Sequence, residues 1–357
     1  MIKNILIVRF RQMGDTILAT SMLNTLRRNY PDAEIDIVLN DRVAPLFEGH
    51  PSISNIIAFS DKERHNALLY LRKAWKTARA KHYDVIIDMR STINTLPFTL
   101  FSLGSRYRIG VRKPYTRVIF NHRVEGCEDY ESMIDHNLKL LEPLRKLKSD
   151  FTDDRNITLS ISDKERQSFA EYMKRMGIDL NRPILLAGVT AKLANKTWAK
   201  ERMVDTLQWL GKNYPGLQMI FNYAPGEEER NAREIYSLMG EPSNIFIDVQ
   251  ARSSREMAAM ASNITFYFGN EGGGRHIVQA MGKPSFVICS PVASKTTWLP
   301  DGGDIVTEGI SAADLVSSEQ YEAMSHAERY NAITADIVKE QLGRFCEKIQ
   351  LRADACE

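Results

Sequence analysis

Short apolar runs of the kind that form buried parallel strands recur along the whole chain. In the first half they cover residues 4–10, 34–40, 55–60, 83–90 and 107–111. In the second half they cover residues 183–189, 217–224, 244–249, 264–270 and 285–290. The segments between them repeat apolar residues at helical spacing, as in residues 16–31, 61–82, 200–214 and 254–262. This alternation predicts an α/β protein with doubly wound parallel sheets.

A polar and charged stretch, KLKSDFTDDRN at residues 146–156, separates the two sets of strands and helices. We therefore predict two Rossmann-like domains, residues 1–155 and residues 156–357, the second of which ends in helices from residue 311 onward. Ligands of such sheets bind beyond the carboxyl ends of the strands. Two domains that face each other would enclose a central cleft, so candidate sites are expected at the carboxyl ends of the strands.

Two basic segments lie in the predicted first domain. Residues 104–123 hold six Lys or Arg residues and no acidic residue, with aromatic residues interleaved. The predicted helix within residues 61–82 carries one stripe of Leu68, Leu71, Trp75 and Ala78, beside the basic residues Arg72, Lys73, Lys76 and Arg79. A solvated surface would explain either segment. The lack of counter-charge in residues 104–123 instead favours a lipid-linked saccharide at an anionic membrane surface.

The overall composition limits the class of protein. Hydrophobic residues make up 43% and charged residues 26% of the chain, as in globular proteins, and the net charge of +2 argues against a nucleic-acid partner. The four cysteines have neither zinc-finger nor CxxC spacing, which favours a reducing compartment. The first apolar run is too short for a signal peptide. We therefore expect a cytoplasmic protein that touches the inner face of the cytoplasmic membrane peripherally.

A glycine-rich junction, GNEGGGRH at residues 269–276, follows one predicted strand and precedes a short helix. Glycines allow close backbone approach and unusual φ angles, and a helix N-terminus attracts anions. Gly272, Gly273 and Gly274, together with Glu271 and His276, are therefore candidates for a phosphate site. A tight turn is the alternative. The motif is neither a Walker motif nor a GxGxxG fingerprint.

Another junction, RFRQMGDTI at residues 9–17, places Asp15 where the first strand ends. Asp15 is a candidate general base, and a helix N-cap is the alternative interpretation. We assign acceptor binding to Arg11 on the same junction and to Arg112 and Lys113 in the basic segment.

Two loops of the predicted second domain carry further polar candidates. Thr190 and Lys196 in GVTAKLANKTW, residues 188–198, could contact a phosphate. In YAPGEEER, residues 223–230, a glutamate could accept hydrogen bonds from ribose hydroxyls, and we choose Glu228. A solvated helix start is the alternative for these glutamates. The sequence contains no Asp-x-Asp element of the kind that holds a divalent ion, so we expect no metal and no cofactor.

These segments in this order resemble glycosyltransferase family 9, the heptosyltransferases of lipopolysaccharide core assembly. The resemblance covers most of residues 1–300 and implies a GT-B fold with the acceptor bound by the first domain and a nucleotide-sugar donor by the second. It also implies inverting, metal-independent transfer, typically of heptose from an ADP-sugar.

The resemblance assigns roles to individual residues. It makes Asp15 the catalytic base, gives donor-phosphate contacts to Thr190 and Lys196, and gives a ribose contact to Glu228. It makes Glu271, Gly272, Gly273 and His276 the donor loop. The family usually has Asp-Thr-Gly where this chain has Glu271, Gly272 and Gly273, which leaves the donor sugar open.

Rival functions remain at this stage. A nucleotide-sugar epimerase on the same architecture would turn over with the donor alone. A non-catalytic nucleotide-sugar or glycan-binding protein would bind donor and be indifferent to loss of Asp15. An NAD-dependent dehydrogenase is disfavoured because no GxGxxG motif follows the first strand.

Overall fold

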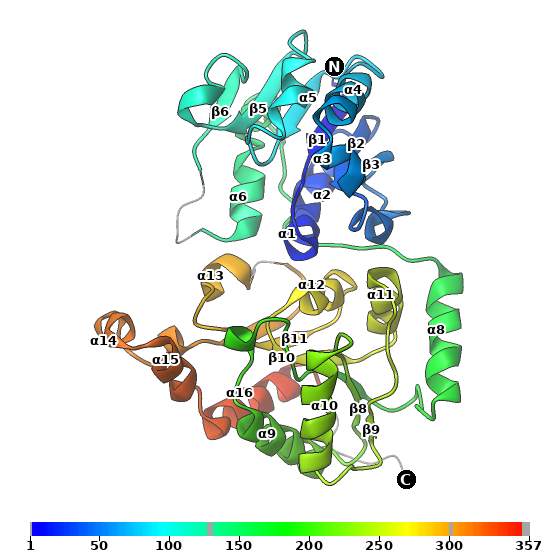
Figure 1. Ribbon diagram of the computed structural model, residues 1–357, viewed down its shortest axis with the longest axis vertical. Coiled ribbons are helices and arrows are strands. Elements are labelled where there is room, and N and C mark those ends of the chain that lie inside the picture. The colour runs from blue at the N-terminus through cyan, green and yellow to red at the C-terminus, as the bar shows by residue number, and fades with distance from the viewer. Residues whose placement is uncertain (1, 127–130, 300–302, 352–357) are drawn as a thin grey trace. The chain divides into compact units, whose positions relative to one another are not determined.

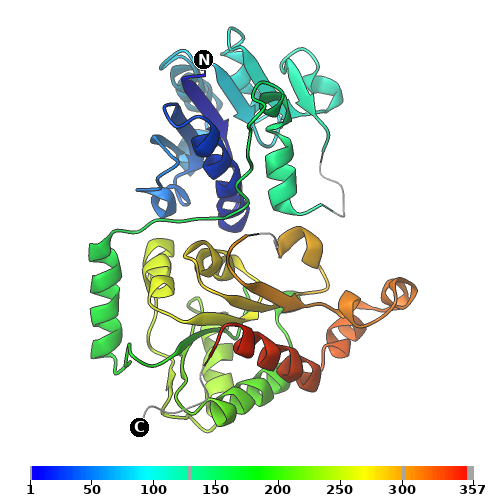
Figure 2. The same ribbon diagram turned by 180° about the vertical axis from the view of Figure 1, so that it is seen from behind.

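The computed structural model describes residues 2–126, 131–299 and 303–351. The chain forms two compact units, Met1–Ile161 and Ser162–Glu357. Each unit is built on one six-stranded sheet in which all neighbouring strands are parallel, with helices beside it (Figures 1 and 2). The predicted doubly wound α/β class is therefore confirmed. No helix in the described ranges is long and apolar enough to cross a bilayer.

The sheet of the first unit has the strand order β3-β2-β1-β4-β5-β6. Its strands are β1 (Asn4–Val8), β2 (Glu34–Asn40), β3 (Asn55–Phe59), β4 (Val85–Asp88), β5 (Tyr107–Val111) and β6 (His122–Val124). Its helices are α1 (Met13–Leu18), α2 (Thr20–Asn29), α3 (Asp61–His65), α4 (Ala67–Ala78), α5 (Leu96–Leu100), α6 (Met133–Lys139) and α7 (Glu142–Arg145), with 3-10 turns η1 (Ala44–Phe47) and η2 (Pro114–Thr116). The strand order reverses between β1 and β4, where α/β sheets usually bind ligands.

The helix predicted over residues 16–31 is two helices, α1 and α2, which meet at Ala19. The hydroxyl of Thr20 donates to the carbonyl of Ile17 at 2.7 Å, and the hydroxyl of Ser21 donates to the carbonyl of Leu18 at 2.9 Å. Such side-chain hydrogen bonds to backbone carbonyls compete with the regular backbone hydrogen bonds of a helix, which is consistent with the break at Ala19.

Helix α4 is oriented differently from what its stripe of large apolar residues suggests. Its buried residues are Tyr70, Ala74, Thr77 and Ala78, so Ala78 alone of the stripe is buried, while Leu68, Leu71 and Trp75 are exposed. Tyr70 packs against the rings of Phe59 and Phe98, with centroids 5.7 and 6.2 Å away. The small side chains of α4 face the sheet because they let the helix approach this aromatic cluster closely.

The sheet of the second unit has the strand order β12-β11-β10-β7-β8-β9. Its strands are β7 (Ile184–Gly188), β8 (Gln218–Phe221), β9 (Ile245–Phe246), β10 (Phe266–Asn270), β11 (Ser285–Ile288) and β12 (Thr307–Ile310). Its helices are α8 (Asp163–Arg175), α9 (Lys200–Asn213), α10 (Glu227–Leu238), α11 (Ser254–Ser262), α12 (Gly273–Ala280), α13 (Lys295–Trp298), α14 (Ser318–Ala323), α15 (His326–Ala332) and α16 (Ala335–Lys348), with 3-10 turns η3 (Ala194–Lys196) and η4 (Ala312–Asp314). Cys289 and Cys346 are free and buried, whereas Cys127 and Cys356 lie outside the described residues.

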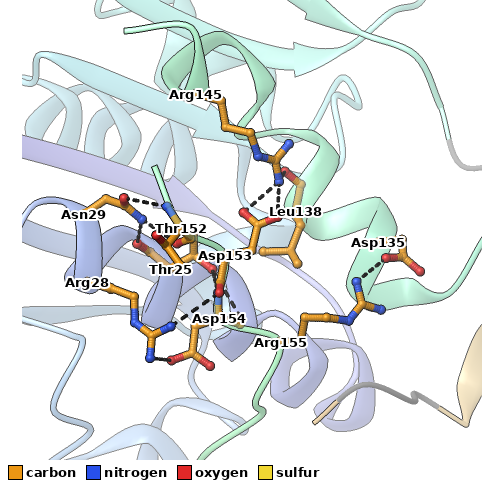
Figure 3. A network of polar contacts seen from close by, with 10 residues as sticks. All are labelled: Thr25, Arg28, Asn29, Asp135, Leu138, Arg145, Thr152, Asp153, Asp154 and Arg155. Atoms are coloured by element: carbon orange, nitrogen blue, oxygen red, sulfur yellow. Dashed lines mark hydrogen bonds and ion pairs between the residues drawn. The ribbon is translucent and has the colours of Figure 1, made fainter. Parts of the chain in front are cut away.

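The polar stretch at residues 150–156 belongs to the first unit and makes polar contacts with α2, α6 and α7 of that unit (Figure 3). The amide of Asn29, at the end of α2, donates to the carbonyl of Thr152 at 2.8 Å and accepts from its backbone N–H at 3.0 Å. Three ion pairs add to the network: Arg28 with Asp154 at 3.3 Å, Arg145 with Asp153 at 2.7 Å, and Arg155 with Asp135 at 2.5 Å. The two compact units consequently divide after Ile161.

We predict that Asn29→Ala loosens this segment. The substitution removes two hydrogen bonds to the backbone of the exposed residue Thr152, and each such bond contributes about 0.5–1.5 kcal/mol. Protease cleavage within residues 150–156 should become at least roughly tenfold faster, because the bound segment opens locally more often. Asn181→Ala, an exposed position of the second unit, is the control. Equal cleavage rates for Asn29→Ala and the wild-type protein would contradict the role of this network.

Candidate functional site

The candidate site of the first unit begins where β1 ends and α1 starts. The N-cap of α1 is Gln12, whose side chain makes no capping bond, and Asp15 lies in the first helical turn. The N-cap interpretation of Asp15 is therefore wrong. The Asp15 side chain is about nine-tenths buried, so its environment is set by its neighbours rather than by bulk water.

Two arginines hold Asp15 in place. The Nε and Nη2 atoms of Arg11 both lie 2.8 Å from Oδ1 of Asp15. Nη2 of the buried Arg9 donates to the Asp15 backbone carbonyl at 3.0 Å and lies 3.8 Å from Oδ1. Burial lowers the pKa of Arg9 to about 10, which still leaves it charged near neutral pH. The side-chain hydrogen bond from Arg11 uses Oδ1; within the described ranges, no hydrogen bond to Oδ2 is present.

Three further residues, which the sequence patterns did not indicate, lie near Asp15 or near the arginines around it. Nη1 of Arg90 donates to the carbonyl of Phe10 at 3.0 Å, and its pKa is lowered by burial and by the charge of Arg11. Asp88, at the carboxyl end of β4, is fully buried, and burial raises its pKa to about 6. His136 on α6 has a lowered pKa because of burial and the nearby charge of Arg9. Arg90 and Asp88 follow a predicted strand next to β1, so the carboxyl-edge rule could have identified them.

The three predicted acceptor residues have different environments. Arg11 contacts Asp15, as described. Lys113 donates from Nζ to the carbonyl of Arg90 at 3.1 Å, which links it to the same edge of the sheet. Arg112 instead pairs with Glu125 at 2.9 Å and lines a separate surface cavity along β6. The structure therefore brings Arg11 and Lys113 to the β1–β4 edge and does not bring Arg112 there.

The candidate site of the second unit is organised by a close approach of β7 and β10. Gly188 and Gly269 are register partners, and a Cβ atom on Gly269 would lie 2.4 Å from the Gly188 carbonyl oxygen. Gly269 has a φ angle of 146°, in the region that favours glycine. The Asn270 side chain bridges the two loops beyond these strands, donating to the Gly188 carbonyl at 3.0 Å and accepting from the Trp198 amide at 2.8 Å.

The glycines of the GNEGGGRH junction play a different part from the one expected. Gly272 has an extended φ of 169°, which any residue can adopt, and Gly273 and Gly274 lie in the first turn of α12. The unusual φ angle belongs to Gly269. A Cβ atom on Gly272 would meet nothing within 4 Å, so the backbone at the start of α12 faces open space.

Glu271 and Lys196 form one polar pair beside that helix start. Nζ of Lys196 lies 2.7 Å from Oε1 of Glu271. Ser290 completes the arrangement, with its hydroxyl 2.9 Å from Oε1 and its amide nitrogen 3.2 Å from Oε2. The lysine assigned to phosphate is thus already neutralised by the glutamate that stands where the family usually has aspartate.

His276 is buried and neutral rather than cationic. Burial, together with the charge of Arg275, holds its pKa well below the usual value. Nη2 of Arg275 donates to Nε2 of His276 at 3.0 Å, because a guanidinium can only donate. The ring proton must then sit on Nδ1, which is buried and has no partner among the described residues. The Nδ1–H of His276 is therefore a buried donor that makes no hydrogen bond to any described residue.

Thr190 and Glu228 lie together at a third place in the second unit. The Thr190 hydroxyl donates to Oε2 of Glu228 at 3.3 Å, and both residues line a cavity of about 250 Å³ between the loop after β7 and the start of α10. Lys192 and Asn231 line the same cavity. No group of three or more His, Cys, Asp or Glu residues within residues 2–126, 131–299 and 303–351 could hold a metal ion.

Comparison with known proteins identifies the family of the chain. The family model of glycosyltransferase family 9 (heptosyltransferase) matches residues 71–298, more than half of the chain. Lipopolysaccharide heptosyltransferase 1 of Campylobacter coli is 21% identical over 294 residues, which are 80% of this chain and 83% of the relative.

Two solved structures share the fold of the whole chain. The family 9 glycosyl transferase of Veillonella parvula has a TM-score of 0.78 at 16% identity, over 98% of this chain and 97% of that one. The E. coli heptosyltransferase WaaC with ADP-2-deoxy-2-fluoro heptose has a TM-score of 0.67 at 14% identity, over 96% and 99%. The predicted GT-B fold is thus confirmed. With its two parallel sheets and the match over residues 71–298, the chain belongs to glycosyltransferase family 9 and is a glycosyltransferase.

Proposed function

We propose that this chain transfers heptose from an ADP-heptose-type donor to a lipopolysaccharide core or a related lipid-linked saccharide, with inversion and without a metal. The observation that carries the proposal is the carboxylate of Asp15, which is held at one oxygen by Arg11 and makes no hydrogen bond through its other oxygen to any residue that the structure describes. A fixed, partly buried carboxylate with one open oxygen is what removal of a proton from a hydroxyl needs. The C. coli relative is named a lipopolysaccharide heptosyltransferase, which supports the substrate class.

In this proposal the first unit binds the acceptor and the second unit binds the donor. Three arginines, Arg9, Arg11 and Arg90, outnumber the two carboxylates beside them, Asp15 and Asp88, so the site keeps a surplus of positive charge even when both carboxylates are ionised. Such a site favours an acceptor with negative charge near the reacting hydroxyl, as phosphate or carboxylate groups provide. Arg11 and Lys113 are the acceptor contacts that this geometry supports best, and Arg112 would contact a more distant part of the acceptor.

The reaction is a single displacement at the anomeric carbon. The acceptor hydroxyl attacks C1 of the heptose while its proton passes to Oδ2 of Asp15. The bond from C1 to the β-phosphate oxygen breaks, and that oxygen leaves with the electron pair as part of ADP. Attack opposite the leaving group inverts the anomeric configuration, so no covalent intermediate on the protein is required.

Groups of the second unit would stabilise the departing diphosphate. The backbone N–H groups at the start of α12 are open to a ligand, and an anion there also gains from the helix dipole. The Nδ1–H of His276 and the ammonium of Lys196 would add two charge-assisted hydrogen bonds. Glu228 and Thr190, in the cavity of about 250 Å³, would hold the ribose.

A lipid-linked acceptor is anchored in a membrane, so the protein must approach the membrane surface to reach it. The basic residues of positions 104–123 would be attracted to anionic headgroups, each contributing roughly 1 kcal/mol near such a surface. We therefore include peripheral association with the cytoplasmic face of an anionic membrane in the proposed function.

We predict that Asp15→Asn lowers kcat by about 10²–10⁴-fold because the amide cannot take the acceptor proton. The Kd for ADP should change less than twofold, since the second unit is untouched. Steady-state kinetics and calorimetry with ADP measure the two effects. Asp32→Asn, an exposed position in the turn before β2, is the control. Turnover close to that of the wild-type protein would remove Asp15 from the mechanism.

We predict that Lys196→Ala and His276→Gln each weaken ADP binding. A lost hydrogen bond to a charged phosphate costs about 1.5–3 kcal/mol, or roughly 10–150-fold in Kd. Glutamine at position 276 can still accept from Arg275, so the packing of α12 should persist. Calorimetry with ADP decides the matter, with Lys212→Ala on the exposed face of α9 as the control. Unchanged Kd values would place these two residues outside the phosphate site.

A further inference from the structure

The outward face of α4 carries large apolar residues that the fold does not use. Leu68 is 76% exposed, Leu71 43% and Trp75 54%. At spacings of three and four positions, these residues lie on one side of the helix. A tryptophan and two leucines in contact with water are a cost to a protein that stays in solution, so their common orientation calls for a partner.

The same layer of the first unit extends this apolar face. Helix α5 packs against α4, and its last residue, Leu100, is 49% exposed. The hydroxyl of Ser102 donates to the carbonyl of Ala78 at 3.2 Å, which ties the following turn to the end of α4. Leu103 in that turn is 52% exposed. We call Leu68, Leu71, Trp75, Leu100 and Leu103 together the α4–α5 face.

Unpaired positive charge accompanies the α4–α5 face. Within the described ranges, no ion pair involves Arg72, Lys76 or Arg79, all of which are exposed. Lys73, which the sequence places in the same basic run, instead turns toward the sheet, where it pairs with Glu63 at 2.7 Å and donates to a carbonyl of β3.

Acidic side chains near the α4–α5 face are already engaged. Asp84 and Asp88 are the only acids between residues 65 and 124. Asp84 accepts from the backbone N–H groups of Lys3 and Asn4, and Asp88 is buried. The exposed face is therefore apolar with a positive border.

We propose that the α4–α5 face is the membrane-docking surface, in which α4 lies in the plane of an anionic lipid bilayer. Leucine and tryptophan side chains would enter the boundary between headgroups and acyl chains, where tryptophan is favoured. Arg72, Lys76 and Arg79 would remain at the level of the anionic headgroups, with their alkyl stems along the apolar surface. A second copy of the chain is a poorer occupant, because a symmetric contact through this face would bring like charges together.

This inference rests on the proposed function for its purpose, since a lipid-linked acceptor requires an enzyme at the bilayer. It does not rest on Asp15 or on the donor site. To the electrostatic attraction proposed for residues 104–123, the α4–α5 face adds an apolar contribution that salt does not screen.

Liposome flotation with the full chain tests the docking surface. Two kinds of vesicle are compared. The first contains phosphatidylcholine with 30% phosphatidylglycerol, about one anionic lipid in three, which supplies the negative surface potential. The second contains phosphatidylcholine alone. We expect the wild-type protein to float only with the anionic vesicles. The variant Leu68→Gln/Leu71→Gln/Trp75→Gln should bind at least roughly tenfold more weakly, because it loses buried apolar area. The control Leu238→Gln changes a leucine of α10 in the second unit that is also 54% exposed, and should bind as the wild type does.

A fluorescence measurement needs no disruptive variant. Trp75→Phe keeps an aromatic ring at the face, so it should float nearly as the wild type does, and the difference between the two emission spectra reports Trp75. With anionic vesicles that emission should shift to the blue and be quenched by lipids brominated on their acyl chains. An unshifted and unquenched Trp75 would overturn the proposal even if the triple variant failed to fold.

Other outcomes would also overturn it. These are equal flotation of the triple variant and the wild type, equal binding to neutral vesicles, or a dimer in sedimentation that the triple variant abolishes. Turnover of a delipidated, water-soluble acceptor separates this inference from the proposed function. The triple variant should retain that turnover, whereas failure of every form to transfer sugar would refute the proposed function and leave the flotation result standing.

Discussion

Parallel pairing of all neighbouring strands is the constraint on which the rest of the structure depends. It requires each crossover to return the chain to the same edge, so the loops that follow the strands gather at the carboxyl ends. In the first unit this brings together Asp15 after β1 and Arg90 after β4. In the second unit, β7 and β10 approach so closely at Gly188 and Gly269 that a side chain on Gly269 would collide with the neighbouring backbone.

The two sites differ in the charge of their side chains, and the difference suits the two substrates of the proposed reaction. Around Asp15 the buried Arg9 and the partly exposed Arg11 and Arg90 give a surplus of positive charge that an anionic acceptor would balance in the proposed function. In the second unit Lys196 is paired with Glu271 and His276 is neutral, so the positive charge beside His276 comes from the buried Arg275. In the proposed function, a donor diphosphate would compete with Glu271 for Lys196, so this acid would affect how tightly the leaving group is held.

The fold could be predicted from the sequence because buried parallel strands such as residues 4–10 are almost uninterrupted apolar runs. The strands β6 and β12 escaped prediction because they are short edge strands with polar residues, HRV and TEGI. The orientation of α4 was also not predicted. Packing on the aromatic cluster buries the side of the helix with mostly small residues and leaves the stripe of larger apolar residues exposed. For the candidate site, strand ends identified Asp15 and Glu271, but the partners of Arg112 and Lys196 depend on side-chain contacts that spacing does not specify.

The central claim is a single displacement in which Asp15 takes the proton of the acceptor hydroxyl. Nuclear magnetic resonance of the product, made from an ADP-heptose of known anomeric configuration and a delipidated acceptor, tests it most directly. The account predicts one new glycosidic bond whose anomeric configuration is opposite to that of the donor, and ADP released in equal amount. Retained configuration, or conversion of the donor in the absence of acceptor, would contradict it.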